Sequence, residues 1–221
     1  MTPWLTIIGV VPLMGALLIT LLPAGRDLLV KQVALATTLV VLGLTVLMCA
    51  DFSTATGAER FQFVQSHDWI KAFGVKYAVG ADGIALVLIA LIAVLVPVVL
   101  LASWDDVESL DVVGPDAPAS SGRKSIKAFF ALLLVLETMM IGVFAATDVF
   151  LFYVFFEAML IPMYFLIGQY GGPRRSYAAV KFLLFSLFGG LLMLAAVIGL
   201  YVQSTYVGEG TLASRLSRTS T

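Results

Sequence analysis

The chain has 221 residues, of which 61% are hydrophobic and 12% are charged, and its formal net charge at pH 7 is -1. A soluble domain is nearer half apolar and a quarter charged, so this composition indicates an integral membrane protein and gives no reason to expect a nucleic-acid partner. Cys49 is the single cysteine and His67 the single histidine, which leaves a disulfide framework, an Fe–S cluster, a haem or a structural zinc without its usual ligands.

Six segments are apolar over about 20 residues, the length needed to cross a hydrocarbon core of about 30 Å. They predict an all-α fold, a polytopic transmembrane helical bundle within residues 1–203, followed by a polar tail at 204–221. The first segment has no cationic region before it and no A-x-A cleavage site, so it is interpreted as a retained span. The predicted spans are 3–22, 31–50, 82–104, 127–146, 149–168 and 178–202.

The distribution of Lys and Arg predicts how the bundle is oriented, because cytoplasmic loops carry an excess of both. The connections after spans one, three and five, with their flanking span ends, hold eight cations, whereas those after spans two and four hold three. The N-terminus is therefore expected outside, and six crossings place the tail outside as well. The eight are Arg26, Lys31, Arg123, Lys124, Lys127, Arg174, Arg175 and Lys181, and the three are Arg60, Lys71 and Lys76.

Two connections are long enough to have a structure of their own. The external segment 51–81 contains two alternating runs, 61–65 and 75–79, which predict short strands and a hairpin. His67 is expected in the polar loop between them. The cytoplasmic segment 105–125 is rich in Asp, Pro, Gly and Ser, which is typical of an irregular loop.

Spans four and five are joined by Thr147 and Asp148 alone. A connection this short predicts an antiparallel pair of helices, with Asp148 as the N-terminal cap of the fifth. At the start of span three, Asp82 is a second candidate cap, and Gly83 after it is interpreted as a position of close packing.

Glu137 and Glu157 lie about ten residues before and after the turn between spans four and five. Each is therefore roughly 15 Å from the outer end of its span, near the middle of the bilayer. A carboxylate at that depth costs several kcal/mol unless it is protonated, paired or hydrated, so each is a candidate proton-translocation residue. If the two face each other, they resist simultaneous ionisation, which suits a proton relay. The alternative is that they face different neighbours and are protonated, hydrogen-bonded packing groups.

Pro162 and Lys181 are secondary candidates, and both have a structural interpretation. Pro162 removes the backbone hydrogen bond to Ala158 and predicts a helix kink one turn after Glu157. The freed carbonyl can hold water beside the carboxyl group, or the kink is purely structural. Lys181 opens span six, where it either extends to the cytoplasmic interface as a topological anchor or takes up protons.

Three segments carry a resemblance to a known family: residues 77–84 (YAVGADGI), 142–168 (GVFAATDVFLFYVFFEAMLIPMYFLIG) and 179–185 (AVKFLLF). They resemble the start of the third span, the fourth-to-fifth span signature and the start of the sixth span in the antiporter-like subunits of respiratory complex I, the proton-pumping NADH:quinone oxidoreductase. The second segment is long and specific, and its FFEAMLIPMY form is closest to the M-type members. The likeness covers essentially residues 1–210.

The resemblance implies a role for Glu157, because the matching glutamate of the family is paired with a seventh-span lysine and belongs to the proton path. It also implies that this chain binds no cofactor and has no catalytic chemistry of its own. NADH, FMN, Fe–S clusters and quinone are then expected in partner subunits. The implied partners are the other membrane subunits, chiefly neighbouring antiporter-like ones, and the implied location is the bacterial inner (cytoplasmic) membrane.

The chain also departs from the family, whose members have two inverted repeats of five helices. Its six predicted spans supply only the first three helices of the first repeat, without the seventh-span lysine, and the polar sequence after Gly210 predicts a truncated or frameshifted product. Two alternatives stay open. One is a homologous subunit of a cation/proton antiporter or membrane-bound hydrogenase, and the other is a non-transporting membrane piece that assembles with partners.

Overall fold

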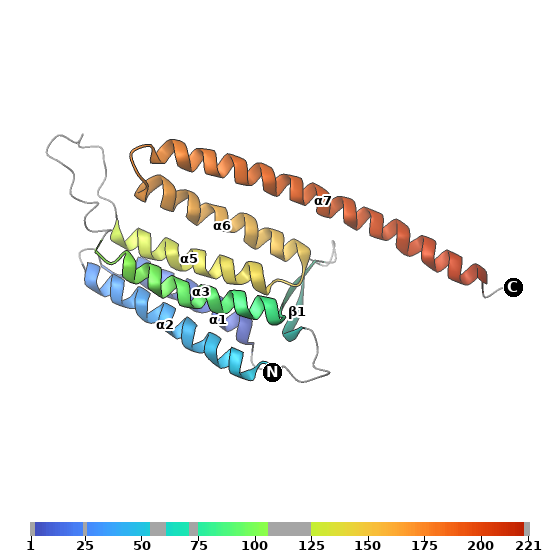
Figure 1. Ribbon diagram of the computed structural model, residues 1–221, viewed down its shortest axis with the longest axis horizontal. Helices are drawn as coiled ribbons and strands as arrows, with labels where there is room; N and C mark the ends of the chain where they lie inside the picture. Colours follow the sequence, from blue (N-terminus) through green and yellow to red (C-terminus); the bar gives the residue numbers. More distant parts are fainter. Residues whose placement is uncertain (1–2, 24–25, 54–60, 71–74, 106–124, 219–221) are drawn as a thin grey trace. The chain divides into compact units, whose positions relative to one another are not determined.

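The computed structural model describes residues 3–23, 26–53, 61–70, 75–105 and 125–218 (Figure 1). Within them, six helices are long and apolar enough to cross a membrane, which confirms the predicted all-α fold with six spans. The predicted loop 105–125 lies almost entirely outside the described residues. The helices are α1 (Trp4–Leu21), α2 (Asp27–Asp51), α3 (Gly83–Ala102), α5 (Ile126–Ala145), α6 (Val149–Tyr170) and α7 (Arg175–Arg218), and the strands are β1 (Gln62–Ile70) and β2 (Val75–Ala81).

The chain divides into two compact units, residues 1–183 and 184–221. The first unit holds α1 to α6, the hairpin and the first turns of α7, and the second unit holds the remainder of α7. The apolar part of α7 ends at Leu200, but its backbone stays helical to Arg218, where the sequence predicts a polar tail. No proline follows Pro173, so nothing in the sequence sterically interrupts the helix.

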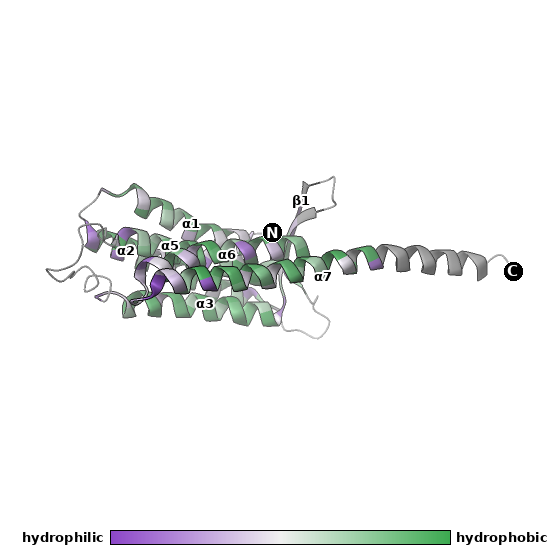
Figure 2. Cartoon of the chain, turned by 90° about the horizontal axis from the view of Figure 1, so that it is seen from above, coloured by the Kyte–Doolittle hydropathy of each residue, from purple (hydrophilic) through white to green (hydrophobic). Residues whose placement is uncertain are grey.

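The helix α5 is the centre of the first unit, since it packs against α1, α2, α3 and α6. Phe130 and Leu134 of α5 are fully buried in this core. The outward faces of the surrounding helices also carry many exposed large hydrophobic side chains, and most of the helical ribbon in Figure 2 is green, the colour of hydrophobic residues. A bundle that is apolar both inside and outside is expected when its solvent is lipid.

The strands β1 and β2 form an antiparallel hairpin, as predicted. Both extend further than the alternating runs suggest, and His67 lies in β1, paired with Tyr77, instead of in a loop. The hairpin is bonded to the α5–α6 turn, because the Thr147 N–H donates to the Ala78 carbonyl at 2.9 Å. We call this end of the first unit the hairpin end.

Two aspartates cap helices as predicted. The Asp148 carboxylate accepts the N–H groups of Phe150 at 2.9 Å and Leu151 at 3.1 Å, and Asp82 accepts the N–H of Ala85 at 2.8 Å. The interpretation of Gly83 is wrong, because a Cβ atom added there would meet nothing within 4 Å. Gly83 is exposed in the first turn of α3, and none of the described residues lies close to it.

Replacing Asp148 with Ala is expected to destabilise the protein by about 1 kcal/mol, because two N–H groups at the start of α6 lose their acceptor. The thermal unfolding midpoint of the detergent-solubilised protein measures this change. Asp148→Asn keeps an acceptor oxygen and is the control, with a midpoint close to wild type. An unchanged midpoint for Asp148→Ala would show that the cap contributes nothing.

Candidate proton-transfer site in the α5–α6 pair

The two glutamates occupy matching positions on adjacent antiparallel helices. Glu137 lies 8 residues before α5 ends at Ala145, and Glu157 lies 8 residues after α6 begins at Val149. At a rise of about 1.5 Å per residue, each Cα lies about 12 Å from the hairpin end. The predicted equal depth in the pair is therefore present in the structure.

Glu137 is completely buried, with a relative exposure of 0%. Neither of its carboxyl oxygens has a hydrogen-bond partner within the described part of the chain. A buried polar group without a partner costs free energy, and a charged one costs far more. Within the described residues, Glu137 is therefore a buried polar group without a hydrogen-bond partner in an apolar bundle.

Glu157 has different surroundings. Its side chain is half-buried, and one carboxyl oxygen, Oε1, is buried without a partner among the described residues. Tyr153, one turn earlier on α6, interacts with the Glu157 carboxyl group through its side chain. Because the Glu137 oxygens have no partner, the two glutamates do not hydrogen-bond to each other.

The two helices are in closest contact between the glutamates and the turn. A Cβ atom added at Gly142 of α5 would lie 2.5 Å from Cδ1 of the Phe155 ring of α6. Real side chains do not approach this closely, so only glycine allows the ring to pack on the α5 backbone. Sequence analysis did not single out this contact, although a glycine inside an apolar helix is a known signal of close helix packing.

The structure places the two secondary candidates without deciding their roles. Pro162 is buried in α6, which remains helical from Val149 to Tyr170, so the Ala158 carbonyl lacks its usual helical donor. Lys181 is exposed on α7, and its ammonium group lies 6.0 Å from the centre of the Tyr177 ring. This distance suits a cation–π contact. The role of Lys181 in proton uptake stays a prediction.

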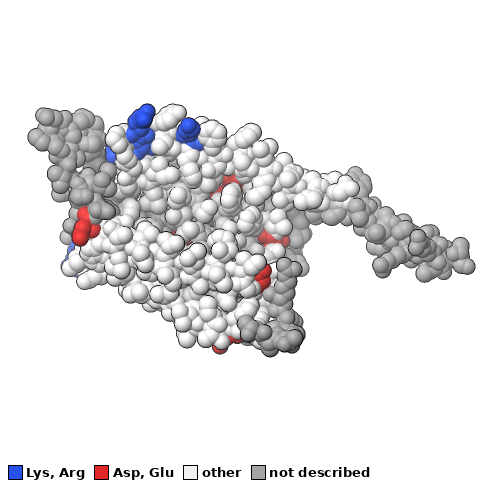
Figure 3. Space-filling model, viewed as in Figure 1, with Lys and Arg blue, Asp and Glu red and all other residues white. Residues whose placement is uncertain are grey.

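Two further lysines make contacts that sequence analysis missed, at the end of the first unit opposite the hairpin. Lys127 Nζ donates to the Leu22 carbonyl at 2.6 Å, so α5 is tied to the end of α1. Lys31 has an exposure of only 2%, and its Nζ lies 5.5 Å above the Trp104 ring. In Figure 3, blue side chains gather over the α6–α7 connection, and red ones lie at separate places elsewhere on the same face.

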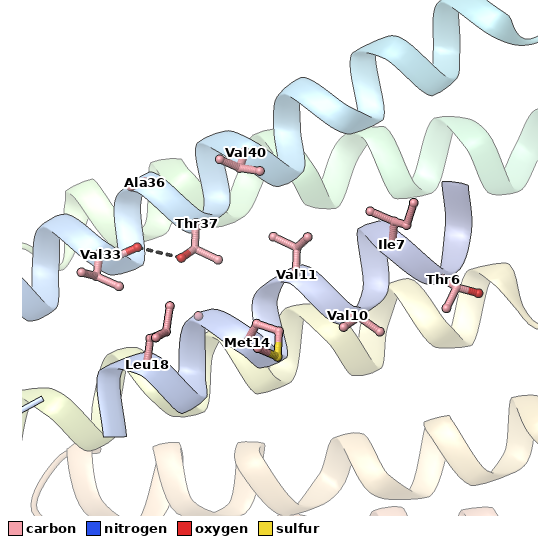
Figure 4. A pocket seen from close by; sticks show the side chains of 11 residues that line it. Thr6, Ile7, Val10, Val11, Met14, Leu18, Val33, Ala36, Thr37 and Val40 are labelled. Carbon is pink, nitrogen blue, oxygen red and sulfur yellow. Dashed lines mark hydrogen bonds between the residues drawn. The ribbon is translucent and has the colours of Figure 1, made fainter. Parts of the chain in front are cut away.

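A groove with a volume of about 590 Å³ runs between α1 and α2 (Figure 4). Its lining is almost wholly apolar, and the hydroxyl of its Thr37 already donates to the Val33 carbonyl at 2.8 Å. None of the residues that line the groove has an ionisable side chain, so the groove is not a candidate proton-transfer site. Within the described ranges, no three His, Cys, Asp or Glu side chains gather where they could hold a metal ion.

The sequence of the chain is similar to sequences of known membrane proteins. Residues 146–214, which include Glu157, match the family model described as NADH:quinone oxidoreductase/Mrp antiporter, TM. The chain is 48% identical to NADH-quinone oxidoreductase subunit M of Mycobacterium tuberculosis over 228 aligned residues, which cover 96% of the chain. The chain is a homologue of subunit M. This confirms the resemblance seen in the three sequence segments, including the likeness to the M-type members.

Other relatives agree. The chain is 36% identical to subunit M of Rhodobacter capsulatus over 95% of its own length. The structure of respiratory complex I from Thermus thermophilus with bound NADH contains a chain that is 30% identical and matches with a TM-score of 0.70 over 90% of this chain. The chain spans 41% of the mycobacterial relative, 38% of the Rhodobacter relative and 36% of the Thermus chain.

Proposed function

We propose that the chain is a membrane subunit of a proton-pumping NADH:quinone oxidoreductase, in which Glu157 and Glu137 take part in proton translocation. One observation carries the proposal: two carboxyl groups lie at equal depth on adjacent helices, with buried oxygens that no described polar group satisfies. Such groups are costly in a membrane bundle and are expected where protons or ions move.

The division of labour in this proposal follows from the chemistry of the side chains. A carboxyl group can accept and release a proton but cannot carry electrons. The redox reaction therefore belongs to partner subunits, which would bind NADH, FMN, Fe–S clusters and quinone. This chain would respond to that reaction through a change in the surroundings of Glu157 or Glu137, because the occupancy of a proton site depends on its local electrostatics.

The proposed location is the bacterial inner membrane, with the N-terminus and the β1–β2 hairpin outside. The support is the asymmetry of Lys and Arg along the sequence. Lys31 and Lys127 then lie toward the cytoplasm, as does the α6–α7 connection. In this orientation Lys181 is on the side from which protons are taken up, and Glu157 and Glu137 lie deeper in the membrane.

A subunit of a cation/proton antiporter is the second candidate, because the matching family model is described by both names. Isolation of the protein from native membranes through an affinity tag separates the two. Co-isolation of flavin- and Fe–S-containing subunits with NADH:quinone reductase activity supports the first candidate. Co-isolation of other membrane subunits without that activity contradicts it, and isolation of the chain alone favours a non-transporting piece.

Replacing Glu137 with Leu in the assembled complex is expected to lower the protons moved per NADH oxidised and to raise thermal stability. The gain would be about 1–3 kcal/mol, because leucine fills the site without two unsatisfied oxygens. NADH-driven acidification of sealed vesicles and the unfolding midpoint measure the two effects. A stability loss with an unchanged proton ratio would instead identify Glu137 as a hydrogen-bonded packing group.

A further inference from the structure

A small cavity lies at the hairpin end of the first unit, between α1, β2, α5 and α6. Its volume is about 210 Å³, and its lining combines apolar side chains such as Ile141 and Phe155 with the polar side chains of Thr6, Tyr77 and Thr138. Sequence analysis did not find this cavity, because its lining residues come from four separate parts of the chain.

A hydrogen-bonded group of side chains lies on the hairpin side of the cavity. The Thr6 hydroxyl donates to Gln65 Oε1 at 2.6 Å and lies 3.2 Å from the Tyr77 hydroxyl. These contacts join α1 to both strands of the hairpin. The Gln65 amide nitrogen is buried and has no partner among the described residues, so this hydrogen-bonded group retains an unused donor.

Thr138 of α5 is the third polar residue that lines the cavity. It is 5% exposed, and its hydroxyl has no partner within the described part of the chain. Four other threonines in these helices satisfy their hydroxyls by donating to a carbonyl three or four residues earlier, as is usual in apolar helices. They are Thr20, Thr37, Thr38 and Thr45, which donate to Leu17, Val33, Leu35 and Val41 respectively.

We propose that this cavity is an internal water-binding site, in which water hydrogen-bonds to the hydroxyls of Thr138, Thr6 and Tyr77. A water molecule occupies about 30 Å³ in the liquid and needs two to four polar partners to remain in a protein interior. The cavity is large enough for several waters, and three of its lining residues carry a hydroxyl. The α1–α2 groove is larger, but its lining is almost wholly apolar.

The position of the site gives it a consequence that rests on the proposed function. Thr138 directly follows Glu137, and it lies 7 residues before the end of α5, or about 10 Å along the helix. Bound water then occupies the hairpin-side half of the bundle, next to the turn of α5 that carries the buried carboxyl group. It provides hydrogen-bonding partners for a proton on that side of Glu137.

A cryo-electron microscopy map of the assembled complex in lipid nanodiscs, at a resolution that shows internal waters, tests the proposal on the unmodified protein. The expected result is water density in the cavity, at about 2.7–3.2 Å from Thr138 Oγ1. A cavity without density, with the Thr138 hydroxyl bonded to the Leu134 carbonyl, would overturn the proposal.

Two variants test the role of Thr138 in the site. Thr138→Val keeps the shape of the side chain without the hydroxyl and is expected to lose the adjacent water density, whereas Thr138→Ser is expected to keep it. Equal density in both variants would contradict the role of Thr138, and the unmodified map still decides if Thr138→Val does not assemble. Water in the cavity together with wild-type pumping by Glu137→Leu would refute the role of Glu137 in pumping and leave the water site intact.

Discussion

Replacing Glu157 with Gln is expected to slow proton translocation through this subunit by about tenfold or more, and so to lower the number of protons moved per NADH oxidised in the assembled complex. Glutamine has nearly the same shape and can still accept a hydrogen bond from Tyr153, which interacts with the carboxyl group in the native protein. It cannot bind and release a proton. The variant therefore removes the proposed chemistry of the site with little change in its packing.

The measurement is NADH-driven acidification of sealed vesicles, with NADH oxidation and complex assembly followed in parallel. Asp148→Asn is the matched control, because it makes the same acid-to-amide change at the helix cap, at the hairpin end, where an amide oxygen can still accept the two N–H groups. The control is expected to pump at the wild-type ratio. Wild-type pumping by Glu157→Gln in a fully assembled complex would remove Glu157 from the proton path.

Replacing Gly142 with Val is expected to destabilise the protein by roughly 3 kcal/mol or more, which is at the upper end for overpacking. The added Cβ would lie 2.5 Å from the Phe155 ring, so α5 and α6 have to separate or the ring has to leave its position. Both changes open the part of the pair that lies between the glutamates and the turn. The unfolding midpoint of the solubilised protein measures the loss.

The second half of this test is a pair of controls. Gly43→Val in α2 is expected to cost much less, because a Cβ there meets nothing within 4 Å. Combining Gly142→Val with Phe155→Ala removes the ring and is expected to recover part of the stability, which a double-mutant cycle quantifies. Equal losses for Gly43→Val and Gly142→Val would show that helix propensity, and not the contact with Phe155, sets the cost.

The features that sequence predicted well are those that depend on neighbouring residues. A span is an apolar run, and a cap such as Asp148 or Asp82 acts on the N–H groups two or three residues later. The equal depth of Glu137 and Glu157 follows from the two-residue turn and the constant rise of a helix. All of these can be obtained from spacing alone.

The features that sequence did not predict depend on which residues meet across the fold. The Thr6–Gln65 and Thr6–Tyr77 contacts join residues 59 and 71 positions apart, and no periodicity encodes such pairs. The hydroxyl of Thr138 differs from those of other threonines only through its surroundings. The error at Gly83 has the same origin, because a glycine permits close packing but does not supply the neighbour.

Hydrogen bonds are present at both ends of the α5–α6 pair. At the turn, Thr147 is bonded to β2 and Asp148 caps α6, and at the far end the Tyr170 hydroxyl donates to the Ser125 carbonyl at 2.6 Å. Only three residues, 146–148, join the two helices, which limits how far one helix can slide along the other.

We therefore expect the two helices of this pair to keep a fixed position relative to each other. Displacing one helix along the other would break the Tyr170–Ser125 bond and strain the short connection at the turn, whereas rotating a side chain about its own bonds need not disturb either. Side-chain rotation is also faster by orders of magnitude than the movement of a helix. Any transfer of a proton to or from Glu137 and Glu157 would then proceed through changes of rotamer on a stationary backbone.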